Sequence, residues 1–256
     1  MDVLVCIKRV PAPGSKIILT DDELMINTKN LGFAISPHEE CAVEEAVQIK
    51  ETHGGETTVL TLGADVSIEQ LRGALAMGID NAVLLETDGQ DWEPIPTANA
   101  ILKSIADQKE NGRIFDAYLF GNESADSGGY QVGVRIAHAL DIPCVTGIKS
   151  IELADGKAIA KREAIGGGWE IYEVDLPAVF TVKEGINLPR YPSLPGRMRA
   201  KKKPIETSTP EVVGGGLEKV RLKSPVEQGS DVEILGHGTE AAEKVAELIR
   251  EMGLFS

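Results

Sequence analysis

The stretch Thr181–Pro204 reads T-V-K-E-G-I-N-L-P-R-Y-P-S-L-P-G-R-M-R-A-K-K-K-P. It follows a β-like run at Ala178–Val182 and carries prolines at positions 189, 192, 195 and 204. Proline fixes φ and donates no backbone hydrogen bond, which disfavours both a continuing helix and a central strand. The sequence therefore predicts a constrained loop here.

This loop is basic and carries two apolar side chains, Leu194 and Met198, in a chain whose formal net charge is −14. The basic residues around them are Arg190, Arg197, Arg199, Lys201, Lys202 and Lys203. Two interpretations remain open. The loop is either a solvated charged segment that prolines stiffen, or a docking surface for other proteins.

The composition is that of a globular protein. With 256 residues, the chain can bury a full core in one domain with an extension, or in one large and one small domain. The hydrophobic content of 42% and the charged content of 26% are ordinary, and no apolar run is long enough to span a bilayer. The first residues place an apolar run before Lys8 and Arg9, the reverse of a secretory signal, so we expect no export.

Three cysteines, Cys6, Cys41 and Cys144, are far apart in the sequence. Their odd number and spacing predict reduced core residues rather than a disulfide framework or a metal site. The net charge of −14 disfavours non-specific binding to nucleic acid. An aromatic content of 4% also leaves few side chains on which bases could stack, so we expect no nucleic-acid partner.

Strand-like and helix-like segments alternate through about residue 150. The clearest start signal is Ser36-Pro37-His38-Glu39, where Ser36 fits a helix N-cap, Pro37 the first helical position and Glu39 a capping box. The predicted strands are Asp2–Lys8, Glu56–Leu62, Asn81–Glu86 and Ala117–Phe120, and the predicted helices are Pro37–Thr52, Ser67–Met77, Pro96–Lys109 and Tyr130–Leu140. Such alternation predicts a doubly wound, mostly parallel, Rossmann-like α/β sheet, and the family resemblance described below implies that it binds an adenine nucleotide.

The pattern changes beyond Lys149. The Asp155-Gly156 turn separates two β-like runs, Ser150–Leu153 and Lys157–Glu163, and predicts a β-hairpin. Further strands are predicted at Trp169–Val174 and Ala178–Val182.

The C-terminal part reads differently again. Ile205–Gly238 has little periodicity and predicts an arm without a core of its own, whereas Thr239–Met252 predicts a helix with Thr239 as N-cap and one apolar stripe. We therefore predict one α/β domain with hairpin additions over residues 1–204, and an arm with a helix over 205–256 that packs on a partner subunit.

Ligands of doubly wound sheets bind at the carboxyl ends of the strands. This rule selects the strand end near Cys6, the helix start Ser36–Glu39, the strand end near Leu62 and the loop Gly121–Gly133, which reads G-N-E-S-A-D-S-G-G-Y-Q-V-G. Backbone N–H groups in such a loop suit a phosphate, although glycines here can equally serve only the turn. Neither G-x-G-x-x-G nor G-x-x-x-x-G-K-[ST] occurs, so no dinucleotide fingerprint or P-loop is predicted.

The run E-G-I-N-L-P-R-Y-P-S-L-P-G-R-M-R-A-K-K-K, residues 184–203, resembles the signature of the electron transfer flavoprotein β subunit, the small subunit of a flavin-carrying heterodimer. A-V-E-E-A at Ala42–Ala46 and A-L-A-M-G at Ala74–Gly78 also match, and the resemblance extends from Met1 to about Ile205. It implies an electron carrier without bond-making chemistry. The implied partners are an α subunit that holds most of an FAD, a dehydrogenase such as an acyl-CoA dehydrogenase, and a membrane quinone oxidoreductase.

By position, the resemblance implies AMP, or a second FAD in the electron-bifurcating branch, at the four segments named above. The implied contacts are Cys6, Ser36, Pro37, His38, Glu39, Leu62, Gly121, Asn122, Glu123, Ser124, Ala125, Asp126, Ser127, Gly128, Gly129, Tyr130, Gln131 and Val132. Departures from the family pattern at Ser36, Asp126-Ser127-Gly128 and Tyr130 leave the nucleotide open. AMP is favoured over FAD.

The resemblance also implies that the basic loop recognises dehydrogenases, with Leu194 as its anchor. The implied docking residues are Arg190, Tyr191, Leu194, Pro195, Arg197, Met198, Arg199 and Lys201. Glu163 matches a glutamate that holds or releases the partner's mobile flavin domain, or is an ordinary hairpin charge. His38 either contacts the redox flavin of the partner subunit or is a solvent-exposed residue at a helix start.

A second class of function is an ATP-using enzyme on the same scaffold. An ATP pyrophosphatase would need a serine- and glycine-rich phosphate loop directly after the first strand, where this chain has K-R-V-P-A-P-G-S-K at residues 8–16. No nucleophile–base pair, metal cluster or paired carboxylates can be identified by spacing. We therefore expect an electron-carrier subunit, cytoplasmic in a bacterium or archaeon and in the mitochondrial matrix of a eukaryote.

Overall fold

A computed structural model describes residues 1–225 and 232–254 of the chain. Its centre is a nine-stranded sheet in the order β11-β5-β4-β1-β6-β10-β7-β8-β9, beside a two-stranded ribbon of β2 and β3. The strands are β1 (Val3–Ile7), β2 (Val10–Pro11), β3 (Phe33–Ala34), β4 (Thr57–Gly63), β5 (Asn81–Glu86), β6 (Ala117–Gly121), β7 (Cys144–Ala154), β8 (Lys157–Glu163), β9 (Trp169–Asp175), β10 (Ala178–Val182) and β11 (Glu206–Ser208).

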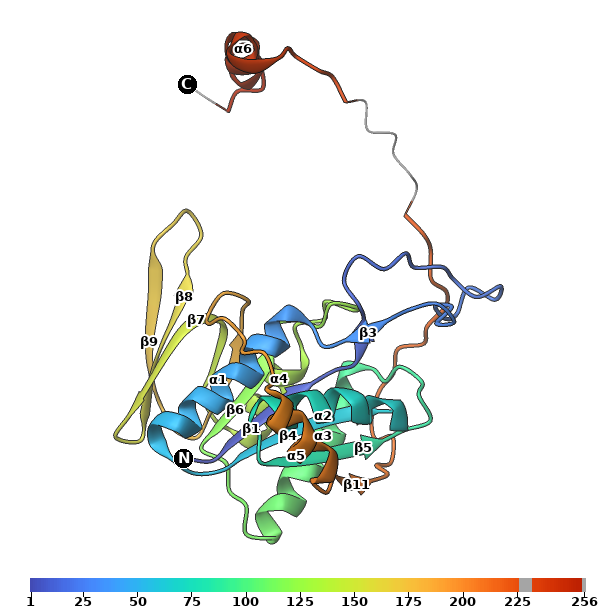
Figure 1. The fold of residues 1–256 in the computed structure, drawn as a ribbon, viewed down its shortest axis with the longest axis vertical. Helices are drawn as coiled ribbons and strands as arrows, with labels where there is room; N and C mark the ends of the chain where they lie inside the picture. Colours follow the sequence, from blue (N-terminus) through green and yellow to red (C-terminus); the bar gives the residue numbers. More distant parts are fainter. Residues whose placement is uncertain (226–231, 255–256) are drawn as a thin grey trace.

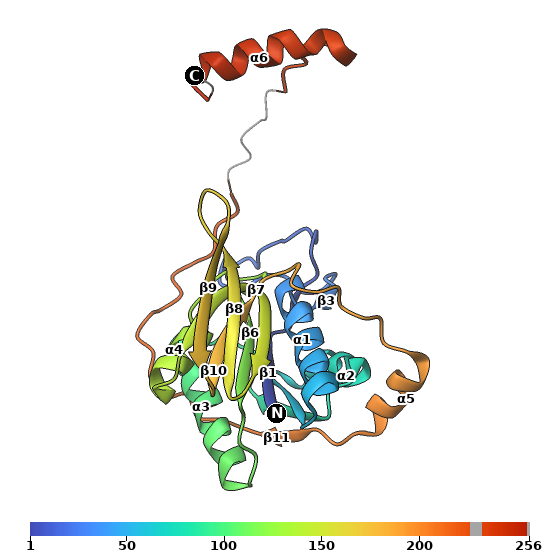
Figure 2. The ribbon, with the colours of Figure 1, turned by 90° about the vertical axis from the view of Figure 1, so that its left-hand side faces the viewer.

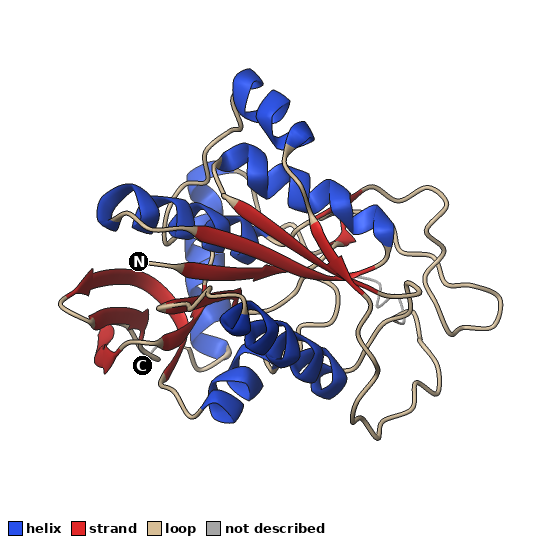
Figure 3. Ribbon diagram, turned by 90° about the horizontal axis from the view of Figure 1, so that it is seen from below, coloured by secondary structure: helices blue, strands red, loops and turns tan. Residues whose placement is uncertain are grey.

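The helices cover both faces of this sheet (Figure 3). They are α1 (Pro37–His53), α2 (Ile68–Met77), α3 (Pro94–Glu110), α4 (Val132–Leu140), α5 (Leu194–Lys202) and α6 (Ala241–Glu251), with short 3₁₀ turns η1 (Asp65–Ser67) and η2 (Gly238–Glu240). The side chains of α1 and α2 join one apolar core, and those of α3 and α4 join the other. These two cores are built by the apolar stripes from which the helices were predicted.

The strand order places a topological switch point beside β1. From β1 the chain proceeds outward through β4 and β5, and α3 then returns it to β6, which pairs with β1 on its other side. Within the nine-stranded sheet, pairing is parallel except where β8 pairs antiparallel with β7 and β9, and the separate β2–β3 ribbon is antiparallel. The predicted doubly wound, mostly parallel α/β sheet with hairpin additions is thus confirmed.

Several predicted helix ends are shifted, each for a local reason. α3 begins at Pro94 rather than Pro96, because a proline suits the first turn. α4 begins at Val132 rather than Tyr130, since Tyr130 adopts a left-handed conformation with φ of +54°. Thr239 is not the N-cap of α6, because it lies inside η2 and the cap position falls on Glu240.

The prediction of a loop throughout Thr181–Pro204 is wrong for its second half, which forms α5 (Figure 2). The Ser193 hydroxyl caps this helix by accepting from the Gly196 N–H at 3.1 Å. Pro195 lies within the first turn, where its missing N–H costs nothing, so four prolines flank or open a helix without interrupting one.

The antiparallel extension and the arm complete the sheet. β7 pairs with β10 at its start and with β8 further on, so the predicted hairpin grows out of the parallel sheet (Figure 1). β11, in the first part of the predicted arm, pairs with β5 and becomes the opposite edge. Residues 226–231 of the arm lie outside the described residues, and no residue of α6 is buried. Among the helices described, none has the length and apolarity needed to cross a membrane.

Candidate functional site

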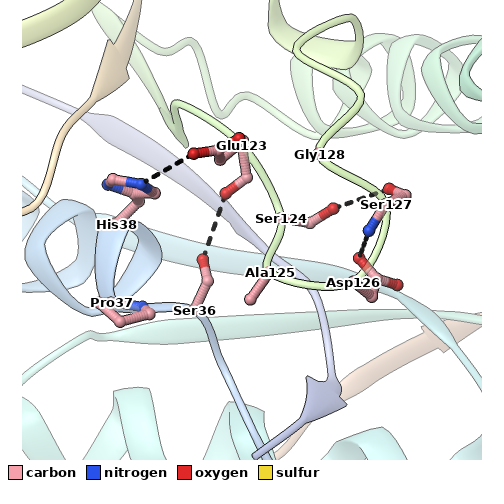
Figure 4. A pocket seen from close by; sticks show the side chains of 9 residues that line it. All are labelled: Ser36, Pro37, His38, Glu123, Ser124, Ala125, Asp126, Ser127 and Gly128. Carbon is pink, nitrogen blue, oxygen red and sulfur yellow. Dashed lines mark hydrogen bonds and ion pairs between the residues drawn. The ribbon is translucent and has the colours of Figure 1, made fainter. Parts of the chain in front are cut away.

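Two segments predicted to bind a ligand converge at the switch point. The start of α1 and the loop after β6 enclose an open cavity of about 430 Å³, a size typical of small-molecule sites. Its lining consists of Ser36, Pro37, His38, Glu123, Ser124, Ala125, Asp126, Ser127 and Gly128 (Figure 4).

Glu39 fastens the start of α1 to the end of β1. Its carboxylate accepts hydrogen bonds from the backbone N–H groups of Ser36 and Lys8, each at 3.0 Å. The predicted capping box between Ser36 and Glu39 is therefore confirmed. Burial raises the pKa of Glu39 to about 7, although both backbone N–H groups oppose the rise. Gly121 lies directly against this side chain, because a Cβ there would approach Glu39 Cγ to 2.7 Å.

His38 links three segments around the cavity. Its Nδ1 accepts a hydrogen bond from the Glu184 N–H at 2.7 Å, and its Nε2 lies 3.4 Å from Glu123 Oε1 (Figure 4). Because Nδ1 acts as an acceptor, the ring proton lies on Nε2 and faces Glu123. The side chain is half-buried between α1 and the segment after β10, so it is more than a solvent-exposed residue at a helix start.

The loop after β6 is held in shape by its own polar groups. Ser124 Oγ and Ser127 Oγ are 2.9 Å apart, and the Ser127 N–H donates to Asp126 Oδ1 at 2.8 Å. Gly128 adopts φ of +56° and donates its N–H to Ser124 O at 3.0 Å. This positive φ explains the glycine, since other residues adopt it only with strain.

Lys8 is a residue of this site that sequence reasoning missed. Its ammonium group forms an ion pair with the carboxylate of Asp126 at the carboxyl end of β1. Burial opposes ionisation of Asp126, but the charge and hydrogen bond of Lys8 outweigh it and hold the pKa of Asp126 below its usual range. The only sequence signal was the position of Lys8 at the end of the first predicted strand.

A polar network behind the loop was also missed. Thr181 on β10 donates its hydroxyl to Asn122 Oδ1 at 2.8 Å and accepts from the Gly147 N–H at 2.8 Å. The Asn122 N–H donates to Val182 O at 2.8 Å. These contacts fix the loop after β6 to β10 and β7, which are its neighbours in the sheet.

The remaining nucleotide-site predictions lie outside the cavity lining. Cys6 is buried in the sheet, where burial and then the charge of Glu39 raise the pKa of its thiol, and Leu62 packs at the edge of the same core. Tyr130 is 55% exposed next to the loop. Gly129, Gln131 and Val132 continue from the lining into the start of α4.

The predicted docking residues form a second region on α5 and the turn before it. Tyr191, Leu194 and Met198 expose 93%, 73% and 60% of their surface. Arg197, Arg199 and Lys201 are exposed beside them, as is Pro195. Arg190 differs, because it is half-buried and pairs with Glu44 and Glu51 of α1.

Glu163 lies at the end of β8, more than half exposed. Its carboxylate oxygens are 4.0 Å from Lys149 Nζ and 4.0 Å from Lys183 Nζ. Lys149 on β7 and Lys183 directly after β10 therefore both lie near this carboxylate, and neither lysine was predicted from the sequence.

The cavity suits a polar ligand with several hydrogen-bonding groups. Hydroxyls of Ser36, Ser124 and Ser127, exposed backbone groups and the Lys8–Asp126 pair match the sugar and phosphate groups of a nucleotide. Within residues 1–225 and 232–254, no group of three or more His, Cys, Asp or Glu side chains is arranged to hold a metal ion.

This chain matches a family model and is similar to several known proteins. The family model described as "Electron transfer flavoprotein domain" matches residues 23–213. "Electron transfer flavoprotein subunit beta" of Bacillus subtilis is 39% identical over 208 residues, covering 80% of this chain and 78% of that protein. The protein of the same name from Syntrophomonas wolfei is 35% identical over 251 residues, covering 98% and 96%. "Electron transfer flavoprotein subunit beta, mitochondrial" of Arabidopsis thaliana is 36% identical over 229 residues, covering 89% and 87%.

Proposed function

Because this chain belongs to the electron transfer flavoprotein β-subunit family, we propose that it pairs with an α subunit and carries electrons between other redox proteins. The donor is a dehydrogenase of the acyl-CoA dehydrogenase class, and the acceptor is a membrane quinone oxidoreductase. An FAD held mainly by the α subunit supplies the redox chemistry when bound. The β subunit makes and breaks no bonds itself. It works in the cytoplasm of a bacterium or archaeon, or in the mitochondrial matrix of a eukaryote.

The observation that carries this proposal is the exposed tip of α5. Leu194 is 73% exposed at the start of a helix that is itself packed on α2, and basic side chains surround it. A single apolar side chain on a firm, basic support suits a partner with an apolar pocket and an acidic rim. Such a small contact fits brief encounters with different redox partners.

The α subunit is proposed to cover two other apolar regions. Val245, Leu248 and Met252 lie on one face of α6 and are 39%, 42% and 64% exposed. Trp169 and Ile171 on the edge strand β9 are 56% and 63% exposed. Apolar faces of this kind are usually buried by a permanent partner. This interpretation keeps residues 1–204 as the nucleotide-binding domain and 205–256 as the subunit-binding arm.

We propose AMP as the ligand of the cavity at the switch point. The supporting features are its volume of about 430 Å³, its three serine hydroxyls and the Lys8–Asp126 pair. In addition, His38 is proposed to contact the flavin of the α subunit, and Glu163 to help position the domain that carries this flavin. The alternative is a second FAD in the same cavity, which would make this an electron-bifurcating flavoprotein.

Co-expression with the α subunit encoded beside it tests the proposal. We expect a yellow heterodimer that contains one FAD and, after release by heat, one AMP per dimer. Release of two FAD molecules would establish the bifurcating alternative. A colourless β chain that binds no α subunit and hydrolyses ATP would refute the electron-carrier function.

The role of α6 has its own test. Val245→Glu with Leu248→Glu places two charges on its apolar face and should weaken the heterodimer at least 100-fold, because each lost apolar burial is worth about 1.5–3 kcal/mol. Lys244→Glu on the polar face changes the net charge by the same amount and is the matched control. Equal heterodimer dissociation constants for the wild type, the double variant and the control, measured by sedimentation, would show that α6 does not contribute to the subunit interface.

A further inference from the structure

The proposed docking loop comprises residues 190–203. Arg190 is its first residue, and its side chain forms ion pairs with two carboxylates of α1. Its Nε and Nη2 donate to Glu44 at 2.8 and 2.9 Å, and its Nη1 and Nη2 donate to Glu51 at 2.6 and 2.9 Å. The backbone N–H of Arg190 also donates to Glu44 Oε2 at 3.2 Å. The planar guanidinium thus joins both carboxylates as a fork, which a lysine cannot do.

Glu44 is the buried half of this arrangement. Its side chain is only 3% exposed, and it accepts a further hydrogen bond from Gln48 Nε2 at 2.8 Å. Burial favours the neutral acid, but the hydrogen bonds from Arg190 and Gln48 outweigh it and lower the pKa of Glu44. The hydrogen bonds that Arg190 donates to Glu51 and then to Glu44 raise the pKa of Arg190, so the guanidinium stays charged at neutral pH.

Asn187 adds a second fastening three residues earlier. Its side-chain amide donates to Cys41 O at 3.0 Å and to Glu45 Oε2 at 2.8 Å. Glu44 and Glu45 are the two acidic residues of the A-V-E-E-A motif at Ala42–Ala46. This motif therefore supplies the carboxylates that accept hydrogen bonds from Asn187 and Arg190 at the start of the loop.

The far end of the loop is fastened to α2 and the turn after it. Arg72 donates to the carbonyl oxygens of Ala200 and Lys203, and Lys203 Nζ donates to Ile79 O at 2.7 Å. Gly196 lies against Ala76 O, which a Cβ would approach to 2.6 Å. The exposed side chains of Tyr191, Leu194 and Met198 lie between these two fastened ends.

We propose that Arg190 is a positioning residue for partner docking: its contacts with Glu44 and Glu51 hold residues 190–203 in the docking conformation before a dehydrogenase arrives. This inference rests on the proposed docking function of the loop. A loop that is ordered beforehand loses less conformational entropy on binding, so its partner affinity is higher. With four of its five donors already used, Arg190 has little left to offer a partner.

The test is reduction of the purified heterodimer by an acyl-CoA dehydrogenase and its substrate, with the heterodimer concentration varied. We expect Arg190→Ala to raise the KM for the heterodimer about 10-fold and leave kcat within about twofold. Arg190→Lys, which keeps one charge but not the fork, should fall between wild type and Arg190→Ala. Flavin and nucleotide contents should not change. Arg113→Ala, which removes another surface ion pair, with Glu206, is the matched control.

Limited trypsin digestion measures directly how well residues 190–203 are held in place. Arg190→Ala should speed cleavage after Arg197 and Arg199, which loss of a mere partner contact would leave unchanged. Glu51→Gln is the milder variant if Arg190→Ala does not fold, because Glu51 is exposed and Arg190 keeps Glu44. It should change KM and cleavage in the same direction. Combined with Arg190→Ala, it should add almost nothing, since both remove the same contact.

Leu194→Ala separates the two possible failures. If Leu194→Ala raises KM whereas Arg190→Ala and Glu51→Gln change neither KM nor the cleavage rate, the positioning role is overturned and the docking function stands. If Leu194→Ala also leaves KM unchanged, the docking function itself fails. A raised KM for Arg190→Ala with unchanged cleavage would make Arg190 a direct partner contact and equally overturn the inference.

Discussion

Glu39 and Glu44 lie on the same helix and are buried to a similar degree, with 5% and 3% of each residue exposed, yet their charges are set in opposite ways. Glu39, at the cavity end of α1, accepts hydrogen bonds from two backbone N–H groups and from no cationic side chain among the hydrogen bonds of the described residues, and burial raises its pKa to about 7. Glu44, further along α1 beside the proposed docking loop, accepts hydrogen bonds from the Arg190 guanidinium, which lower its pKa despite burial. Two carboxylates with similar exposed fractions thus have pKa values shifted in opposite directions, because burial penalises the charge of Glu39 more strongly and because Arg190 and Gln48 donate hydrogen bonds to Glu44.

The difference also separates the tasks of the two ends. The cavity end holds a carboxyl group whose protonation changes near neutral pH, at the point where β1 and α1 meet. The part of α1 beside the proposed docking loop holds the ion-pair cluster of Arg190, Glu44 and Glu51, which joins this loop to the helix. Four predictions test this division, in order of decreasing expected effect.

Glu39→Gln carries the largest expected effect. Because folding raises the pKa of Glu39 from 4.5 to about 7, its stabilising contribution is complete below pH 4.5 and is lost as the pH rises through 7. Relative to the variant, the wild type should lose roughly 3 kcal/mol of unfolding free energy over this window, at about 1.4 kcal/mol per pH unit. Urea unfolding followed by tryptophan fluorescence at several pH values measures the difference. Parallel pH profiles for the two proteins would contradict a raised pKa.

Leu194→Ala should raise the KM of the heterodimer for its dehydrogenase about 30-fold, which corresponds to about 2 kcal/mol for a docking anchor. Flavin content should stay the same, because Leu194 lies on α5, away from the cavity. Leu188→Ala is the matched control, since Leu188 is 89% exposed in the same segment but is not a predicted docking residue. Equal KM values for both variants and the wild type would show that α5 is not the docking tip.

Glu44→Gln should destabilise the protein at neutral pH by about 1.5 kcal/mol, because it weakens charge-assisted hydrogen bonds to Arg190. The sign of its pH dependence is opposite to that of Glu39→Gln. A lowered pKa stabilises the fold above the ordinary value of 4.5, and this advantage is lost as the pH falls below it. The same unfolding series tests the sign. A stability gap that instead changes between pH 5 and 8 would contradict the charged state of Glu44.

Lys8→Ala should have the smallest effect, a roughly fivefold weaker affinity for AMP, since a partly exposed ion pair is worth about 1 kcal/mol or less. Calorimetric titration of AMP into the nucleotide-free heterodimer measures it. The KM for the dehydrogenase should not change, because Lys8 lies at the cavity end. A change in KM without a change in AMP affinity would mean that the two ends of α1 are not separate.

Part of the candidate site was predictable because its signals are local. The capping box at Ser36 and Glu39 and the glycine-rich loop after β6 each depend on residues close together in the chain, and both were found at the cavity. The loop prediction over α5 failed for a local reason too. Prolines were counted as helix breakers, although Ser193 and Pro195 together open a helix.

The long-range contacts were not predictable in the same way. Lys8 and Asp126 are 118 positions apart, and Arg190 and Glu44 are 146 apart. No spacing rule links such residues, because their proximity depends on the strand order and on where the chain returns beside β1. The exposure of Leu194 likewise follows from how α5 packs on α2.

Hydrophobic periodicity and cap residues act over a few residues, so the amino-acid sequence was enough to predict the alternating strands and helices, the doubly wound class and the family resemblance. The position of β10 between β6 and β7, the Lys8–Asp126 pair and the contact of Arg190 with α1 became known from the three-dimensional structure. The physical reason is that ion pairs and buried carboxylates act over a few ångströms in space, and the fold alone brings distant residues that close.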